Sequence, residues 1–164
     1  MKKRTTWDKN EIIDCGDYYE ICLYNVKSQE IARTKIDKDD LEKIKNSKWC
    51  LMYGYAISNS NNKSIYLHTF ILGKPTKGYE IDHINHDKLD NRKQNLRFVT
   101  HSQNGMNRKY KGYYWSKSDK RWHARIIINQ KRINLGYFIN EQDAINARKI
   151  AVEKYFGEYA YNFN

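Results

Sequence analysis

Four polar residues stand at fixed distances in the middle of the chain. His83 directly follows Asp82, Asn95 lies 12 positions after His83, and Asn104 lies 21 positions after it. Hydrolysis of a phosphodiester bond needs a base beside a water molecule, a divalent cation to take up negative charge, and oxygen ligands for that cation. These side-chain types meet all three needs, so the sequence predicts a nuclease site between residues 82 and 104.

Asp82 and Asn104 are the members of this set that suit a metal ion. Carboxylate and amide oxygens are typical ligands of a hard cation such as Mg²⁺, which keeps several waters and takes its other ligands from phosphate. We therefore expect a divalent metal, with Mg²⁺ favoured and Mn²⁺ as the alternative. Cys15, Cys22 and Cys50 form no C-x-x-C pair, so we expect no structural zinc and reduced thiols in an intracellular protein.

Two strands and a helix must position these side chains. Residues 80–84 (EIDHI) and 96–100 (LRFVT) are typical of short strands, and the segment between them is rich in turn-forming Asp and Asn. Thr100 and Gln103 form a capping-box pattern, which predicts that a helix begins after Thr100 and brings Asn104 back toward the first strand. Neighbouring residues of a strand point to opposite faces, so Asp82 and His83 diverge unless the strand end is irregular. The sequence predicts a ββα unit.

Residues 67–108 resemble the HNH nucleases, also called His-Me finger or ββα-metal nucleases, and in particular the homing endonucleases of phages and mobile introns. The resemblance lies in LHTFILGKP, YEIDHINHDKLDNRKQNLRFVTHSQN and MNR. It implies that Asp82 and Asn104 are the metal ligands and that His83 is the general base. It also implies that Asn95 holds the loop and orients the His83 ring through its carbonyl.

Three positions in this segment need separate interpretation. Asn104 stands where many members of the family carry His, and such H-N-N variants occur within it, so we still expect activity. His86 stands where relatives often have Gly, and it either contacts DNA or fills a turn. His68 lies in LHTFIL, where alternation places it on the face opposite Leu67 and Thr69; it either orients a phosphate or another side chain, or has no such accessory role.

The segment after residue 108 predicts a basic sheet backed by a helix. Three short strand patterns are divided by SKSDK and NQK, and a helix follows from Asn140, its predicted N-cap, to a stop at Gly157. Alternation along WHARIII places the even-numbered residues of 122–128 on the core face. Residues 109–135 carry a net charge of +7 and residues 136–164 a net charge of −1, so we expect the sheet to face phosphates.

This segment resembles the APETALA-type (ethylene-response-factor) DNA-binding domain through KGYYW, RWHARI, LGYF, EQDAINARKIAVEKYFGEYA and the terminal NF. The resemblance implies a three-stranded antiparallel sheet packed on one helix, with the sheet in the major groove of double-stranded DNA. Plant members carry other residues at several of these positions, so their target sequence does not carry over. The DNA-binding residues that we expect are Tyr114, Ser116, Lys117, Arg121, Arg125, Arg132 and Asn134.

Composition favours a polyanionic partner. The net charge of +11 and the sequence pI near 9.5 provide salt-sensitive attraction to phosphates. No apolar run approaches a membrane span, and MKKRTTWDKN is not followed by the apolar stretch of a signal peptide. We therefore expect a cytoplasmic protein, encoded by a phage or mobile element and working in a host cell. We expect no membrane partner and no small-molecule cofactor, and we favour a monomer.

The length of 164 residues and the 40% hydrophobic content suit an α+β protein of three modules. We expect a scaffold or accessory DNA-contacting module over residues 1–66, the HNH core over 67–108 and the APETALA-type domain over 109–164. In the first module, EICLYNV predicts a strand, DKDDLEKIKNSKW a short helix capped by Asp37, and GYAISNSNNKSIYL a hairpin with an Asn-rich turn.

The sequence thus predicts a metal-dependent, site-recognising DNA endonuclease of the homing type, which leaves 5′-phosphate and 3′-hydroxyl ends. The alternative is a DNA-binding regulator that retains an inactive HNH scaffold. A structural protein with incidental basic charge would leave both patterns unexplained.

Overall fold

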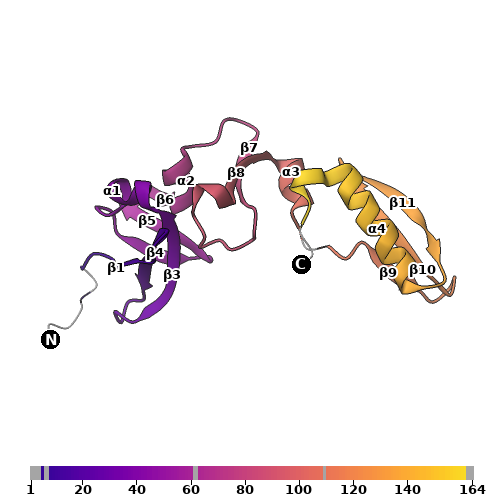
Figure 1. The fold of residues 1–164 in the computed structure, drawn as a ribbon, viewed down its shortest axis with the longest axis horizontal. Coiled ribbons are helices and arrows are strands. Elements are labelled where there is room, and N and C mark those ends of the chain that lie inside the picture. The colour runs from indigo at the N-terminus through magenta and orange to yellow at the C-terminus, as the bar shows by residue number, and fades with distance from the viewer. Residues whose placement is uncertain (1–4, 6–7, 61–62, 109, 162–164) are drawn as a thin grey trace. The chain divides into compact units, whose positions relative to one another are not determined.

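The structure is a computed structural model of the chain, and it describes residues 5, 8–60, 63–108 and 110–161. The chain divides into two compact units, Met1–Phe98 and Val99–Asn164 (Figure 1). Helices are combined with small antiparallel sheets, which confirms the predicted α+β class. The Asn-rich turn at 61–62 and the terminal NF at 162–163 lie outside the described residues.

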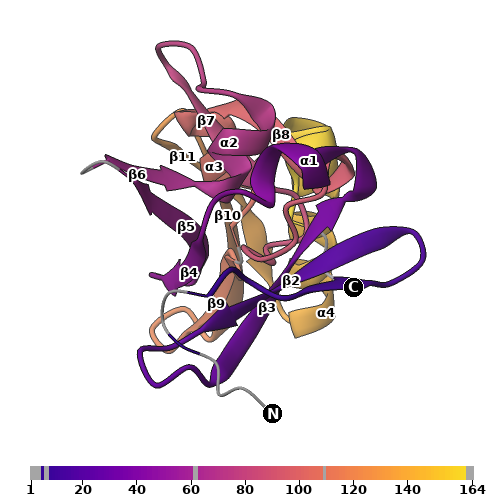
Figure 2. The same cartoon turned by 90° about the vertical axis from the view of Figure 1, so that its left-hand side faces the viewer.

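The first unit contains two three-stranded antiparallel sheets, with strand orders β1-β2-β3 and β4-β5-β6 (Figure 2). Their apolar side chains form one core, in which Trp49, Ile21 and Ile36 are at most 1% exposed. This core fixes the position of β3, on which the candidate site depends. The strands are β1 (Ile12–Asp14), β2 (Tyr18–Tyr24), β3 (Glu30–Asp37), β4 (Trp49–Met52), β5 (Tyr55–Ser60) and β6 (Lys63–Tyr66).

The short helices of this unit partly correct the sequence-based expectations. A 3-10 turn, η1 (Lys38–Asp40), leads into α1 (Leu41–Ile44), as predicted. Asp37 makes no capping hydrogen bond there, and its carboxylate instead accepts from the backbone N–H of Lys93 at 2.7 Å. The alternation expected around His68 is wrong, because α2 (Leu67–Leu72) is a helix with two apolar residues, four apart, buried on one side.

The predicted order of two strands and a helix is confirmed. β7 (Tyr79–His83) pairs with β8 (Leu96–Thr100), and the connection ends in the 3-10 turn η2 (Lys93–Asn95). α3 (His101–Met106) begins with the complete capping box between Thr100 and Gln103. The boundary between the two units falls within β8, so α3 belongs to the second unit. The three-module division stays a prediction.

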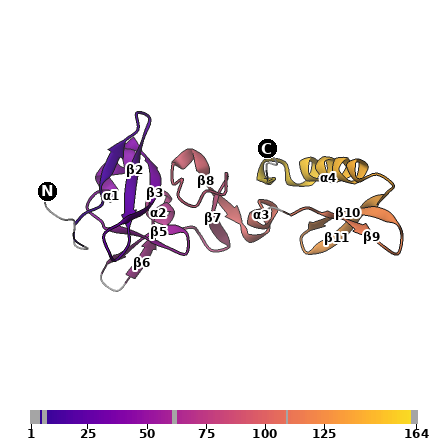
Figure 3. The ribbon, with the colours of Figure 1, turned by 90° about the horizontal axis from the view of Figure 1, so that it is seen from below.

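The second unit is a three-stranded antiparallel sheet with one long helix, as predicted (Figure 3). Ala124 and Ile126 are fully buried on the face that packs against the helix, so the expected core face is correct. Asn140 precedes the helix but makes no capping hydrogen bond, and its amide lies 3.5 Å from the Asp143 carboxylate instead. The elements are β9 (Tyr113–Ser116), β10 (Arg121–Ile128), β11 (Lys131–Phe138), α4 (Glu141–Phe156) and η3 (Gly157–Tyr159).

Helix lengths also bear on the membrane question. Within the described ranges, none of the helices has the length and apolar character that crossing a bilayer requires.

Candidate active site at the end of β7

Asp82 and His83 form the centre of the candidate site, at the last two positions of β7. Both are buried, with relative exposures of 7% and 6%. Asp82 contacts Arg97 of β8, whereas the His83 ring contacts Asn91 in the loop that follows β7. The two side chains therefore have different partners, as expected for neighbours on a strand.

Arg97 binds the Asp82 carboxylate with two of its nitrogens. Nε donates to Oδ2 at 3.0 Å, and Nη2 lies 2.9 Å from the same oxygen. Both side chains are largely shielded from water, so a geometry of this kind is more restraining than an exposed ion pair. Arg97 thus holds the carboxylate that the sequence predicts as a metal ligand.

The His83 ring is packed among other rings. It lies 5.2 Å from His68 and 6.1 Å from Tyr55, measured between ring centroids. Burial lowers the pKa of His83 below its usual value, and the hydrogen bond from the ring to Asn91 opposes part of that shift. The imidazole is therefore neutral near pH 7, which is the state in which it can accept a proton.

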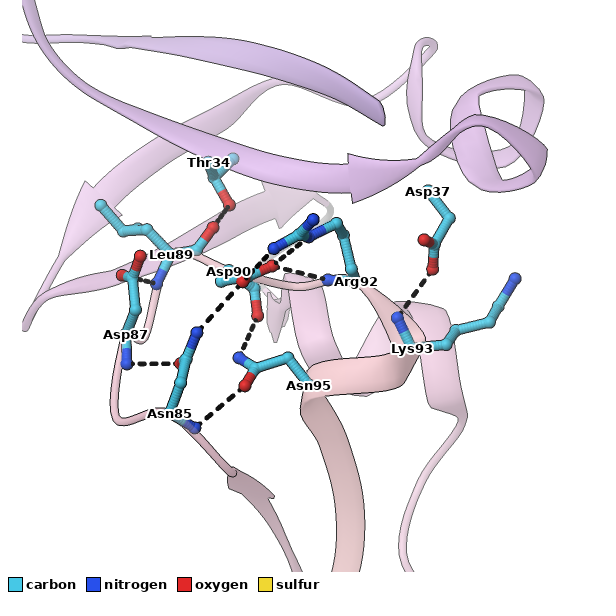
Figure 4. Close-up of polar contacts among 9 residues, drawn as sticks. All are labelled: Thr34, Asp37, Asn85, Asp87, Leu89, Asp90, Arg92, Lys93 and Asn95. Carbon is cyan, nitrogen blue, oxygen red and sulfur yellow. Dashed lines mark hydrogen bonds and ion pairs between the residues drawn. The ribbon is translucent and has the colours of Figure 1, made fainter. Parts of the chain in front are cut away.

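The loop at 84–95 is held by its own buried polar side chains (Figure 4). Asp90 accepts two hydrogen bonds from Arg92, both at 2.7 Å, and one from the Asn85 amide at 3.1 Å. Burial opposes ionisation of Asp90, but the hydrogen bonds and charge of Arg92 outweigh it and lower the pKa of this carboxyl. The ionised Asp90 therefore links Asn85 and Arg92, which lie on either side of it in the loop.

Asn95 closes the same loop from its far end. Its amide donates to the Asp90 carbonyl at 2.8 Å, and its side-chain oxygen accepts from the Asn85 backbone N–H at 3.0 Å (Figure 4). These contacts are those of a residue that holds the loop. The Nε2 atom of His83 is bound by Asn91, which the motif did not single out. An additional influence of Asn95 on the ring stays a prediction.

Strand β3 provides the support on which the loop rests. The Lys35 backbone N–H donates to the Leu89 carbonyl at 2.7 Å, and the Asn91 N–H donates to the Lys35 carbonyl at 2.9 Å. Thr34, which is fully buried, donates its hydroxyl to the Leu89 carbonyl at 2.8 Å (Figure 4). Strand β3, which lies in the segment expected to be a scaffold or an accessory DNA-contacting module, therefore helps to build the candidate site.

The remaining candidate residues lie in different surroundings. His68 stacks on Tyr66 at 5.2 Å and contacts the His83 ring, and burial lowers the pKa of His68 to about 4, with His83 adding to the shift. His86 is exposed in a turn with φ of +65°, a conformation that glycine adopts most readily. Asn104 lies half-buried in α3 of the second unit.

The available donors fit a hard cation. In the part of the chain that the structure describes, three or more His, Cys, Asp or Glu side chains nowhere gather as metal ligands would. One carboxylate and one amide suit an ion that keeps several waters and uses substrate phosphate, as Mg²⁺ does, and do not suit a zinc site closed by Cys and His. Cys15, Cys22 and Cys50 are free thiols.

A second candidate surface lies on the side of the β9–β11 sheet opposite α4. We call it the outer sheet face and define it by Tyr114, His123, Arg125, Arg132 and Tyr137. His123 pairs across the strands with both tyrosines, and the Arg125 guanidinium lies 5.1 Å from the centre of the Tyr114 ring. Aromatic rings and guanidinium groups together suit contact with a nucleic acid.

Most of the predicted DNA-binding residues are exposed. Tyr114 is 43% exposed, while Ser116 is half-buried and donates to the Asp119 carboxylate at 2.8 Å. Tyr137, which is 54% exposed, is not among the predicted residues, because only strand register brings it beside His123. Arg125 is half-buried, and the other exposed members of the predicted set are Lys117, Arg121, Arg132 and Asn134.

Comparison with known proteins agrees with this geometry. The sequence model of the HNH endonuclease family matches residues 71–106, which include β7, its loop, β8 and all of α3. An uncharacterised HNH endonuclease of Acanthamoeba polyphaga mimivirus is 30% identical over 174 residues, covering 97% of this chain and 91% of that protein. No solved structure matches the chain.

A buried Asp-His pair at the end of a strand, followed by a pinned loop, a returning strand and a capped helix, defines a ββα nuclease unit. The chain belongs to the HNH endonuclease family, and it is a nuclease that acts on DNA.

Proposed function

We propose that this HNH endonuclease is metal-dependent, recognises a site in double-stranded DNA as homing endonucleases do, and leaves 5′-phosphate and 3′-hydroxyl ends. The observation that carries the proposal is the position of His83, which is buried beside Asp82 at the end of β7, next to a loop that is pinned at both ends, and whose pKa is lowered by burial. A general base needs a fixed position and an unprotonated form at the working pH.

In the proposed mechanism, His83 removes a proton from the attacking water while Asn95 and Asp90 keep the loop rigid. Asp82 and Asn104 are the proposed ligands of a divalent cation, Mg²⁺ or Mn²⁺, which when bound supplies positive charge to the scissile phosphate and the leaving 3′ oxygen. Arg97 keeps the Asp82 carboxylate in one orientation. The leaving oxygen takes its proton from solvent.

We assign recognition of the DNA to the outer sheet face, in the manner of an APETALA-type domain. This face combines exposed tyrosines with arginines, and the exposed Lys117 and Arg121 flank the turn between β9 and β10 of the same sheet. A sheet of this size fits the major groove. We further propose a monomer with accessory roles for His68 and His86, encoded by a phage or mobile element and working in the cytoplasm of a host cell.

One observation favours the alternative, a DNA-binding regulator with an inactive HNH scaffold. The carboxylate of Asp82 is already compensated by the guanidinium of Arg97, so a cation would have to share or displace that partner. In this alternative the chain binds duplex DNA with the same surface but does not cut it.

Cleavage of a supercoiled plasmid that carries the natural locus distinguishes the two functions. We expect products in Mg²⁺ that vanish in EDTA and in Asp82→Asn, with ends that DNA ligase seals directly. Tight binding without products would support the regulator instead. The ratio of nicked to linear plasmid also shows whether one strand or both are cut.

A further inference from the structure

A line of buried hydrogen bonds connects the His83 ring to strand β3. The ring Nε2 lies 3.2 Å from the Asn91 side-chain oxygen, the Asn91 amide donates to the Thr34 hydroxyl oxygen at 2.8 Å, and that hydroxyl donates to the Leu89 carbonyl at 2.8 Å. Asn91 is 1% exposed and Thr34 is 0% exposed. Solvent therefore does not compete for these bonds.

The far end of the line determines the direction of every bond in it. The Leu89 carbonyl can only accept, so the single hydroxyl hydrogen of Thr34 is directed to it. The hydroxyl oxygen then has only lone pairs to offer to Asn91, so the amide must present its NH₂ group there. This orientation leaves the Asn91 carbonyl oxygen facing His83, and that oxygen can only accept.

A neutral imidazole has one N–H, and an acceptor beside Nε2 places that hydrogen on Nε2. The lone pair is then on Nδ1. The alternative tautomer would set the Nε2 lone pair against the lone pairs of the Asn91 oxygen, 3.2 Å away. In a buried site this repulsion is costly, since neither group can form a hydrogen bond with water instead.

Backbone pairing keeps the two ends of the line in place. Lys35 is bonded on one side to Leu89 and on the other to Asn91, and it forms a parallel bridge with Asp90. Thr34 precedes Lys35 on β3. The next residue of this strand, Ile36, is fully buried in the core of the first unit. The orientation of the ring is thus tied to a sheet that lies outside the region matched to the family.

We propose that Thr34 and Asn91 are positioning residues that hold His83 in the Nε2–H tautomer, so that Nδ1 is the atom that takes the proton from water. This inference rests on the proposed function of His83 as the general base. During the reaction one O–H bond of water breaks and an Nδ1–H bond forms, while the new oxygen–phosphorus bond replaces the bond to the 3′ oxygen. The ring becomes an imidazolium, and its Nε2–H stays bonded to Asn91.

The tautomer is measured directly in the wild-type protein without DNA. Long-range ¹H–¹⁵N correlation spectra of the imidazole rings, recorded at about pH 8 where an ordinary histidine is neutral, separate Nε2–H from Nδ1–H forms, and the His83→Ala spectrum assigns the signals. We expect Nε2–H in wild type. An Nδ1–H form would overturn the inference whatever the activity.

Variants of Thr34 test the consequence for catalysis. Thr34→Val keeps the shape but removes the acceptor for Asn91, so we expect His83 to lose its single tautomer and the single-turnover cleavage rate to fall about tenfold or more, as for supporting partners in other sites. Thr34→Ser keeps the hydroxyl and should restore both the spectrum and the rate. DNA affinity should be the same in all three proteins.

Ser58→Ala is the matched control, because it removes another buried hydroxyl in the first unit. Equal losses of rate in Thr34→Val and Ser58→Ala would show a general structural effect and contradict the inference. If Thr34→Val does not fold, the wild-type spectrum still decides. Absence of wild-type cleavage with an intact Nε2–H form would overturn the nuclease mechanism while supporting the orienting role of Asn91.

Discussion

At the scale of single residues, burial sets the chemistry of the two neighbouring histidines. His83 and His68 lie with their ring centroids 5.2 Å apart, and burial is the main cause of the lowered pKa of each. A second proton near the first would be opposed by both desolvation and charge repulsion. The pair is therefore kept neutral over the pH range in which His83 is proposed to act as a base.

The lowered pKa of His68 predicts a loss of stability in acid. Its folded pKa, about 4, lies below the ordinary value, so the unfolded chain takes up the proton first. The contribution of neutral His68 is complete above about pH 6.5 and is lost as the pH falls toward 4. His68→Phe should flatten this dependence of the unfolding free energy, measured by urea titration at several pH values, with the remaining slope due in part to His83.

The matched control is His86→Gln, which replaces an exposed histidine of the same unit. It should leave the slope between pH 4 and 6.5 unchanged, to within about 0.5 kcal/mol of unfolding free energy. A wild-type protein whose stability rises on acidification through this range would contradict the assignment.

Sequence spacing was sufficient to single out Asp82 and His83, which the structure places together at the end of β7. It was not sufficient to find Thr34 and Asn91, which are 57 positions apart and meet only through the pairing of the loop with β3. Arg97 was also missed, since its role depends on strand register. Contacts between distant segments have no signature in a single sequence.

At the scale of elements, the loop at 84–95 is held by buried hydrogen bonds and an ion pair. The main contacts are those of Asp90, which is 2% exposed and paired with Arg92. Asp90→Asn should lower the unfolding free energy by about 2 kcal/mol or more, because it leaves a partly buried guanidinium without its charged partner. Denaturant unfolding followed by Trp49 fluorescence measures the loss.

Glu42→Gln provides the comparison, because it removes an ion pair with Lys45 whose two side chains are 76% and 42% exposed. That pair should contribute less than about 0.5 kcal/mol. Equal effects of the two substitutions would show that the loop does not depend on Asp90.

Gly112 tests the packing of the second unit. It has φ of +69°, and a Cβ atom there would collide with the side chain of Arg148 and press on the Arg125 carbonyl. Gly112→Ala should therefore cost about 1–3 kcal/mol, measured by unfolding with Trp115 and Trp122 fluorescence. Gly105→Ala is the control: it lies in α3 with open space around it, so helix propensity predicts no loss or a gain of up to about 1 kcal/mol.

The elements of the ββα unit were predictable because each has a local signal, the clearest being the capping box at Thr100. The predicted caps at Asp37 and Asn140 were wrong as hydrogen-bonded caps, although both residues stand at helix starts. The Asp37 carboxylate instead accepts a hydrogen bond from the backbone N–H of Lys93, 56 positions away. A residue of a type favoured at N-caps can therefore form a hydrogen bond with another partner instead of capping the helix.

At the scale of the whole molecule, the net charge of +11 makes affinity for DNA depend strongly on salt. Arg125→Ala and Arg132→Ala, both on the outer sheet face, should each weaken binding and lower the slope of log affinity against log salt by roughly 1. Fluorescence anisotropy with a labelled duplex measures the slope. Lys149→Ala removes an exposed charge of α4 and should leave the salt slope nearly unchanged. An equal change of slope in this variant would show that the DNA does not bind mainly at the outer sheet face.

Single-turnover cleavage of the natural locus in Mg²⁺ shows whether this nuclease cuts DNA through His83. His83→Ala should lower the rate by about a hundredfold or more, as expected for loss of a general base, while duplex affinity stays within about twofold of wild type. Equal rates for the two proteins would show that His83 is not the general base.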